Sequence, residues 1–246
     1  MACRYKNYLG NWMIDAHCHI DLYDDPIALA QKIHHSRMSC VAVTMLPSHF
    51  RMGETHLSPF DNIHSALGIH PLRVSEGQNE VDDFLQISQS CEFIGEVGLD
   101  FSDEGKSTKE LQIEVFSTIV KGFSRGKFVS IHSRMAHYDV ARILGEEGVQ
   151  SACFHYFTGG VVAAKELAKQ GHFFSVNQRM LRGRNQDLVR ELPRDRILVE
   201  SDGPFLSKAP LSAIKDTYTQ IGKIWGMDLS DTESLIAKNF ASCRTR

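Results

Sequence analysis

The sequence lacks the features of a membrane-spanning or disulfide-bonded protein. In its 246 residues no run approaches the roughly 18 apolar residues that cross a bilayer, and no apolar segment of signal-peptide length follows the first basic residues. The six cysteines are scattered without C-x-x-C pairs, which is typical of reduced thiols rather than of a disulfide framework. We therefore expect a cytoplasmic protein with no membrane span.

The sequence also has little net charge and no glycine-rich phosphate loop. A formal charge of -3 and an isoelectric point near 6.4 argue against a protein that coats nucleic acid through a basic surface. The pattern G-x-G-x-x-G is absent, which disfavours an open, doubly wound sheet. Neither absence excludes an enzyme that handles phosphate groups locally through bound metal ions.

Short apolar segments recur along the chain, and segments with helical periodicity separate most of them. This alternation predicts parallel strands covered by helices, and eight such units favour closure into a barrel. We predict an α/β fold with a single (β/α)8 TIM barrel over residues 13–246, preceded by an extension at 1–12, and a last helical region near 211–242. The predicted strands span 12–18, 39–46, 63–70, 92–99, 127–132, 151–156, 172–176 and 196–201.

Residue types that bind metal ions stand where the predicted strands end. His17 and His19 end the first strand, and side chains two residues apart on a strand point the same way. In such barrels the carboxyl ends of the strands form the active site. Four imidazoles and two carboxylates there suit two divalent metal ions with one bridging carboxylate. The predicted ligands are His17, His19, Glu96, His132, His155 and Asp202.

Six segments resemble, in order, the motifs of the TatD family of metal-dependent deoxyribonucleases within the amidohydrolase superfamily. The resemblance extends over nearly the whole chain and implies a DNA substrate and two divalent metal ions, Mg²⁺, Mn²⁺ or Zn²⁺. The matching segments are D-A-H-C-H-I-D (15–21), A-L-G-I-H-P (66–71), I-G-E-V-G-L-D (94–100), I-H-S-R (131–134), H-Y-F-T-G (155–159) and E-S-D-G-P-F (200–205).

The same resemblance implies roles for individual residues. Glu96 would bridge the two metals, and His70 would lie near the scissile phosphate. We expect Asp202 to accept the proton of a metal-bound water. The resemblance implies that one metal is held by His17, His19 and Asp202 and the other by His132 and His155.

Other residues have weaker signals. Asp100 is predicted to orient a metal-binding histidine, with a solvated loop aspartate as the alternative. Arg134 either contacts substrate phosphate or pairs with a neighbouring loop. Residues 179–196 carry six arginines after the seventh strand, where loops of such barrels bind phosphate, although a solvated helix face is also possible. From this segment we predict that Arg179, Arg182 and Arg184 bind the nucleic-acid backbone.

Three segments resemble the QatD branch of the family more closely, namely 21–23, 174–181 and 202–205. QatD nucleases belong to four-component anti-phage systems, so the resemblance implies an ATPase and a QueC-like protein as partners. The chain departs from the common T-D-[SA]-P pattern at Ser201 and Gly203.

Two other functions stay open at this point. One is an amidase or lactonase on the same barrel, and the other is a non-catalytic scaffold subunit. Many barrels of the superfamily bridge their metals with a carboxylated lysine at the position of Glu96, so the glutamate favours the nuclease branch. The complete set of candidate ligands argues against a scaffold.

Overall fold

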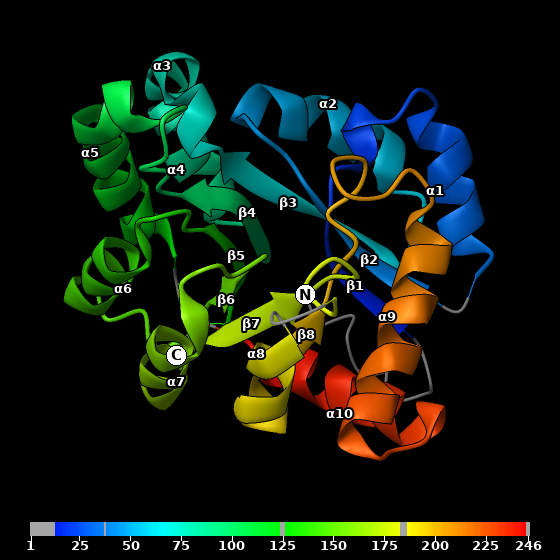
Figure 1. Cartoon of the computed structure of the whole chain (residues 1–246). Coiled ribbons are helices and arrows are strands. Elements are labelled where there is room, and N and C mark those ends of the chain that lie inside the picture. The colour runs from blue at the N-terminus through cyan, green and yellow to red at the C-terminus, as the bar shows by residue number, and fades with distance from the viewer. Residues whose placement is uncertain (1–12, 37, 124–125, 183–185, 245–246) are drawn as a thin grey trace.

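Eight parallel strands form one sheet in chain order in the computed structural model, which describes residues 13–36, 38–123, 126–182 and 186–244. Each strand pairs with the next along the chain, and helices surround the strands (Figure 1). The predicted (β/α)8 barrel is confirmed. The strands are β1 (Met13–Cys18), β2 (Met38–Val43), β3 (Ile63–Ile69), β4 (Phe93–Gly98), β5 (Phe128–His132), β6 (Cys153–Phe154), β7 (Phe173–Val176) and β8 (Ile197–Val199).

Local sequence explains where several helices begin and end. Proline begins α1, α2 and α9, where its missing N–H costs no helical hydrogen bond. Gly226 adopts a left-handed φ of 65° and ends α9, so the predicted helical region at 211–242 is two helices. The helices are α1 (Pro26–His34), α2 (Pro47–Leu57), α3 (Val74–Gly77), α4 (Val81–Ser88), α5 (Lys109–Ile119), α6 (His137–Glu146), α7 (Gly160–Lys169), α8 (Gln186–Glu191), α9 (Pro210–Trp225) and α10 (Leu229–Ser242).

None of the helices in the described part of the chain is both long and apolar enough to cross a membrane.

Strand β6 is shorter than the predicted segment 151–156. The N–H of His155 still donates to the carbonyl of Ile131 at 3.0 Å, but Tyr156 adopts a left-handed φ of 39°. This conformation turns the chain away from the sheet directly after His155.

The barrel closes between the segment that follows β8 and strand β1 with the residue that follows it. The N–H of Asp202 donates to the carbonyl of His17 at 3.0 Å, and the N–H of His19 donates to the carbonyl of Gly203 at 2.8 Å. In addition, the N–H of Ser201 donates to Asp15 Oδ1 at 2.9 Å. These bonds hold the first and last predicted ligands of the chain next to one another.

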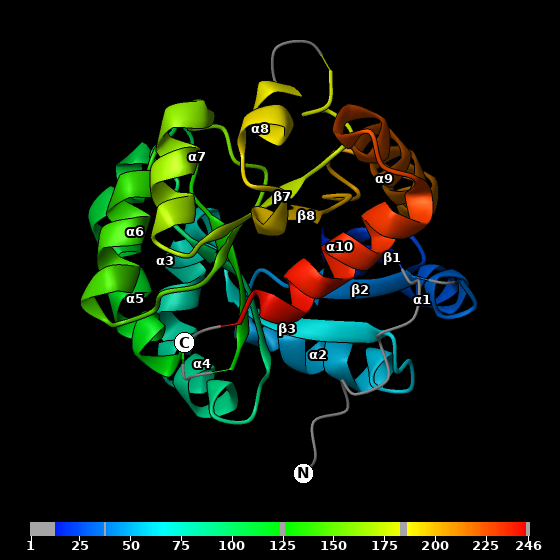
Figure 2. The same cartoon turned by 90° about the horizontal axis from the view of Figure 1, so that it is seen from below.

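Helix α10 covers the amino end of the barrel (Figure 2). The ring of Phe240 lies 5.0 Å from that of Phe128 and 6.4 Å from that of Phe93, measured between centroids. The Asn239 amide donates to the carbonyl of Ile197 at 2.8 Å. Because packed side chains fill this end, access to the barrel interior is left to the carboxyl ends of the strands.

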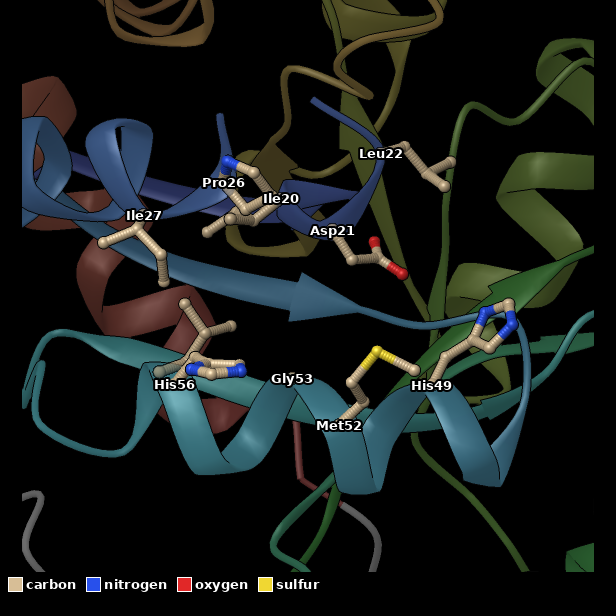
Figure 3. Close-up of a pocket in the computed structure, with 10 residues that line it drawn as sticks. Ile20, Asp21, Leu22, Pro26, Ile27, His49, Met52, Gly53 and His56 are labelled. Carbon is tan, nitrogen blue, oxygen red and sulfur yellow. The ribbon is translucent and has the colours of Figure 1, made fainter. Parts of the chain in front are cut away.

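A groove of about 330 Å³ opens between α2 and the short 3-10 turn η2 (Ile20–Leu22) with the start of α1 (Figure 3). We call it the α1–α2 groove. It is lined by residues 20–22, 26–27, 49, 52–53 and 56–57.

Candidate metal centre

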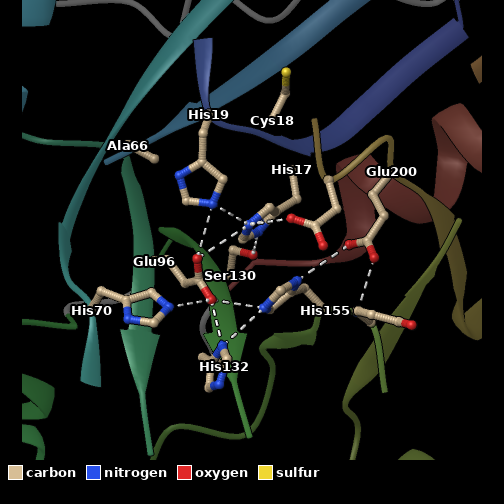
Figure 4. Close-up of polar contacts among 12 residues, drawn as sticks. His17, Cys18, His19, Ala66, His70, Glu96, Ser130, His132, His155 and Glu200 are labelled. Carbon is tan, nitrogen blue, oxygen red and sulfur yellow. Dashed lines mark hydrogen bonds and ion pairs between the residues drawn. The ribbon is translucent and has the colours of Figure 1, made fainter. Parts of the chain in front are cut away.

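Glu96, on β4, lies at the centre of a ring of imidazoles (Figure 4). Its Oε2 atom is 3.1 Å from His19 Nε2 and 3.4 Å from His17 Nε2. Its Oε1 atom faces the other three imidazoles, at 2.6 Å from His132 Nδ1, 2.8 Å from His155 Nε2 and 3.2 Å from His70 Nε2. The two oxygens of one buried carboxylate therefore face two separate groups of histidines.

Asp202 lies at the same mouth, directly after β8. Its Oδ1 atom is 3.9 Å from His17 Nε2, and its backbone has a left-handed φ of 46°, which aspartate tolerates better than most residues. One ligand atom each from His17, His19 and Asp202 lies within 4.8 Å of the others. The structure thus brings all six predicted ligands together from five strands.

The two carboxylates have opposite electrostatic surroundings. Burial raises the pKa of Asp202 to about 7, because the charged form loses its hydration. Burial acts in the same direction on Glu96, but the imidazoles of His70 and His155 outweigh it and hold the pKa of Glu96 well below its usual range. Glu96 is consequently charged at neutral pH, whereas Asp202 titrates close to it.

The histidines differ in a similar way. Burial, and then the neighbouring His155, lowers the pKa of His17 to about 3. Burial also disfavours protonation of His155, yet Glu96 and Glu200 raise its pKa well above the usual value. Positive charge is therefore favoured between the carboxylates. This buried set of imidazole nitrogens and carboxylate oxygens fits divalent cations, whose binding would displace protons from the site.

Three side chains orient the histidines from behind. Asp100 Oδ2 lies 2.8 Å from His132 Nε2, which is the contact predicted for Asp100, and this leaves His132 Nδ1 to face Glu96. Ser130 Oγ lies 2.8 Å from His17 Nδ1. Carboxylate and hydroxyl partners of this kind fix the ring orientation of metal-binding histidines.

Glu200 is the third of these side chains, and the sequence analysis missed it. It is fully buried, and its Oε2 atom is 3.7 Å from His155 Nδ1. Ser175 Oγ donates to Glu200 at 2.5 Å and Asn177 Nδ2 at 2.9 Å. The available signal was its position at the carboxyl end of the eighth strand, inside the E-S-D-G-P-F segment that also contains Asp202.

His70 has a defined proton position. Its Nδ1 atom accepts the N–H of Leu72 at 3.1 Å, so the hydrogen of the neutral ring is on Nε2. That Nε2 atom faces Glu96 Oε1. The ring therefore presents a hydrogen-bond donor to the mouth.

The predicted substrate arginines fall in different places around the mouth. Arg134 is half-exposed and pairs with Glu104 Oε2 at 3.1 Å, the loop pairing that the sequence left open, although it also lines the mouth cavity of about 560 Å³. Arg179 is exposed and lines the same cavity. Arg182 is exposed but is not part of this lining, and Arg184 lies outside the described residues.

Phe205 is a further residue at the mouth that the sequence analysis did not single out as a site residue. Its ring is 58% exposed and stands edge-on to the imidazole of His19, with centroids 5.1 Å apart. Cys18, in contrast, is fully buried between the two histidines of the first strand segment.

Two of the three segments singled out in the sequence, 21–23 and 202–205, are in contact. A Cβ atom on Gly203 would overlap the hydroxyl of Tyr23, which donates to the carbonyl of Ser207 at 2.7 Å. The tyrosine hydroxyl thus occupies the space that a serine or alanine side chain would need at position 203. The side chains at 21–23 and 202–205 therefore constrain one another.

Comparison with known proteins identifies relatives over the whole length. A family model described as TatD related DNase matches residues 14–244. The chain is 28% identical to the metal-dependent hydrolase YabD of Bacillus subtilis over 247 residues, covering 92% of this chain and 96% of YabD. It is 29% identical to human deoxyribonuclease TATDN3 over 223 residues, covering 80% of each. The crystal structure of the TatD homologue YJJV from Escherichia coli has the same fold, with a TM-score of 0.84 at 18% identity over 96% of this chain and 98% of that one.

Proposed function

This chain belongs to the TatD related DNase family of metal-dependent hydrolases, and on that premise we propose that it hydrolyses phosphodiester bonds in DNA with two divalent metal ions held around Glu96. The observation that carries the proposal is the division of the imidazoles between the two oxygens of Glu96. A carboxylate in this position can bridge two cations. In the proposed assignment His17, His19 and Asp202 hold one ion, and His132 and His155 hold the other.

The chain's own groups have distinct tasks in such a reaction. Bound ions of this kind supply a water of lowered pKa and a Lewis acid at the phosphoryl oxygens. Asp202, whose Oδ1 atom lies 3.9 Å from His17 Nε2 at the mouth, would accept the proton of the attacking water. His70 donates from Nε2 to a phosphate oxygen or to the leaving oxygen. Arg134 and Arg179 line the mouth cavity, and in this proposal they contact phosphate from its wall.

Metal content and substrate class together test this proposal. We expect protein loaded with Mn²⁺ to hold about two ions per chain by elemental analysis and to cleave DNA but not a panel of amides and lactones. The presence of Glu96 rather than a lysine supports the phosphodiester substrate over the amide or lactone alternative. Absence of bound metal after loading, or turnover of amides alone, would contradict the proposal.

The arginines of the 179–196 segment offer a matched comparison. Arg179→Ala should weaken binding of a short DNA strand and reduce its salt dependence by about one counterion. Arg182→Ala should change both less, because its side chain does not line the mouth cavity. Equal effects of the two substitutions would show that an arginine need not line the mouth cavity to contact the DNA backbone. Arg182 and Arg184 stay proposed substrate residues until this is measured.

We also propose that the protein is the nuclease of an anti-phage system with an ATPase and a QueC-like partner. The support is the QatD-like sequence at 21–23, 174–181 and 202–205, two of whose segments pack against each other through Tyr23 and Gly203. Co-expression with the neighbouring genes should protect cells from phage, and Asp202→Asn should abolish protection. Protection that survives this substitution would favour the scaffold alternative. A cytoplasmic location stays a prediction.

A further inference from the structure

The α1–α2 groove has the shape and chemistry of a small ligand site. Its volume of about 330 Å³ lies at the lower end of the range for small-molecule pockets. Ile27 projects from α1 on one side, and Met52 projects from α2 on the other (Figure 3). Leu22, Ile27 and Met52 are all more than a third exposed. Apolar walls with open space between them suit a flat ring.

Gly53 keeps the floor of this groove open. It lies inside α2, where glycine is less favourable than alanine by about 1 kcal/mol. Its backbone does not require glycine, because its φ is not in the left-handed range. A Cβ atom there would meet nothing within 4 Å. Neither backbone conformation nor crowding requires glycine here, and the missing side chain leaves the floor of the groove open to an occupant.

A buried acceptor marks one end of the groove. Asp21 Oδ1 is buried and has no hydrogen-bond partner among the described residues. Asp21 and His49 lie at the same end of the groove in Figure 3, and His56 lies at the other. A buried carboxylate oxygen without a partner loses free energy unless a donor reaches it, so the occupant should carry an N–H or O–H group.

Residues at one end of the α1–α2 groove follow the first strand and its proposed metal ligands closely in the chain. Asp21 follows the proposed ligand His19 by two residues, and its carboxylate interacts electrostatically with both His19 and His49. His49 is in the first turn of α2, the helix that follows β2 in the chain. A DNA strand held at the metal centre would therefore have its neighbouring nucleotide at this end of the groove.

A nucleobase combines the required properties. It has two apolar faces, and its edge carries an exocyclic amino group in guanine, cytosine and adenine, whereas the only donor on the edge of thymine is a ring N–H. We propose that the α1–α2 groove binds one unpaired base of the DNA strand that is cleaved at the metal centre, and that Asp21 accepts a hydrogen bond from an amino group of that base. This inference rests on the proposed nuclease function and adds a base-recognition site to it.

Filling the groove tests the inference without requiring turnover. The probe is a short single-stranded DNA that contains 2-aminopurine, whose fluorescence is quenched on stacking, and the parent protein is the Asp202→Asn variant, so that the strand stays intact. Gly53→Phe should weaken binding, detected by the change in 2-aminopurine fluorescence, by about tenfold or more, the size expected for the loss of the apolar contacts of one base. Gly145→Phe is the matched control, because Gly145 also lies in a helix with nothing within 4 Å of an added Cβ. Equal binding by the parent and Gly53→Phe, or equal loss in Gly145→Phe, would overturn the inference.

The role of Asp21 is tested by base preference. The parent should bind strands with guanine, cytosine or adenine at the variable position about tenfold more tightly than a strand with thymine, and Asp21→Asn should reduce this preference to about twofold or less. Metal analysis of this variant shows whether the neighbouring His19 site is intact. An unchanged preference in a variant with normal metal content would overturn the assignment of Asp21.

A small phosphodiester separates this inference from the proposed function. Gly53→Phe in the otherwise native chain should hydrolyse bis(p-nitrophenyl) phosphate at the native rate, because that substrate does not reach the groove. If the native protein with bound metal hydrolysed no phosphodiester but still bound the probe through the groove, the proposed function would fail and the base site would stand. Normal hydrolysis together with binding that does not depend on the groove would support the proposed function and overturn the base site.

Discussion

The chain buries histidines in two regions, and only one of them resembles a metal centre. In the mouth, His155 lies between Glu96 and Glu200, which raise its pKa well above the usual value although burial opposes this. In the outer layer, His172 stands edge-on to Phe154 at 5.1 Å, and burial lowers its pKa to about 4. Both imidazoles are buried. Convergence on carboxylates, rather than burial, therefore distinguishes a candidate ligand from a packing histidine.

The largest effect should follow from removal of the central carboxylate. Glu96→Ala leaves two groups of imidazoles without the carboxylate whose two oxygens face them, so we expect both metal ions to bind weakly and hydrolysis to fall by on the order of 1,000-fold or more. The thermal unfolding midpoint should change little, because Glu96 serves the site rather than the apolar core. Glu110→Ala, on the exposed face of α5, is the control. Near-native turnover by Glu96→Ala would mean that the histidines of the mouth, like His172, do not hold the ions needed for hydrolysis.

A smaller effect is expected for a residue that contacts a proposed metal ligand but is not itself a ligand. Asp100→Asn keeps the size of the side chain but weakens the acceptor that faces His132 Nε2 at 2.8 Å. Metal affinity, measured by titration calorimetry, should fall by about 10–100-fold, as is usual when such a partner is lost. Asp103→Asn, in the same loop and exposed, should have no effect. If both substitutions behaved alike, the carboxylate behind His132 would not contribute to the site.

A substitution at the rim of the mouth should change stability through side-chain packing. Gly203→Ala forces a methyl group onto the Tyr23 hydroxyl, and we expect the free energy of unfolding to fall by about 1–3 kcal/mol with a parallel loss of hydrolysis. Tyr23→Phe removes the hydroxyl and should recover part of this loss in the double variant. Denaturant unfolding of all four proteins measures the coupling. Strictly additive effects would mean that the two side chains do not compete for one space.

The outer region should affect acid stability and leave hydrolysis unchanged. The imidazole of folded His172 takes up its proton near pH 4, whereas an unfolded histidine does so near pH 6.5, so the unfolded state binds more protons between these values. The free energy of unfolding should fall by up to about 3 kcal/mol as pH decreases from 6.5 to 4, and this contribution should be constant above pH 6.5. His172→Phe should remove that part of the pH dependence, as measured by denaturant unfolding at several pH values. Loss of hydrolysis in this variant at neutral pH would contradict the distinction between the two regions.

The barrel and its six candidate ligands could be predicted from the sequence because both depend on the order in which strands, helices and metal-binding residues follow one another along the chain. Apolar strands that alternate with helices have few arrangements available, and parallel strands bring their carboxyl ends to one side. Residues such as His17 and Asp202, at opposite ends of the chain, therefore meet as a consequence of topology alone. Their types and positions were enough to indicate a metal site.

Only the tertiary structure determined which side chains contact one another within the barrel. It determined which oxygen of Glu96 faces which histidine, that Arg134 pairs with Glu104, and that Glu200 lies behind His155. It also showed that Tyr23 takes the space beside Gly203, and that a groove opens over Gly53. These facts depend on distances of a few ångströms between residues far apart in the chain, which periodicity and motif spacing do not encode.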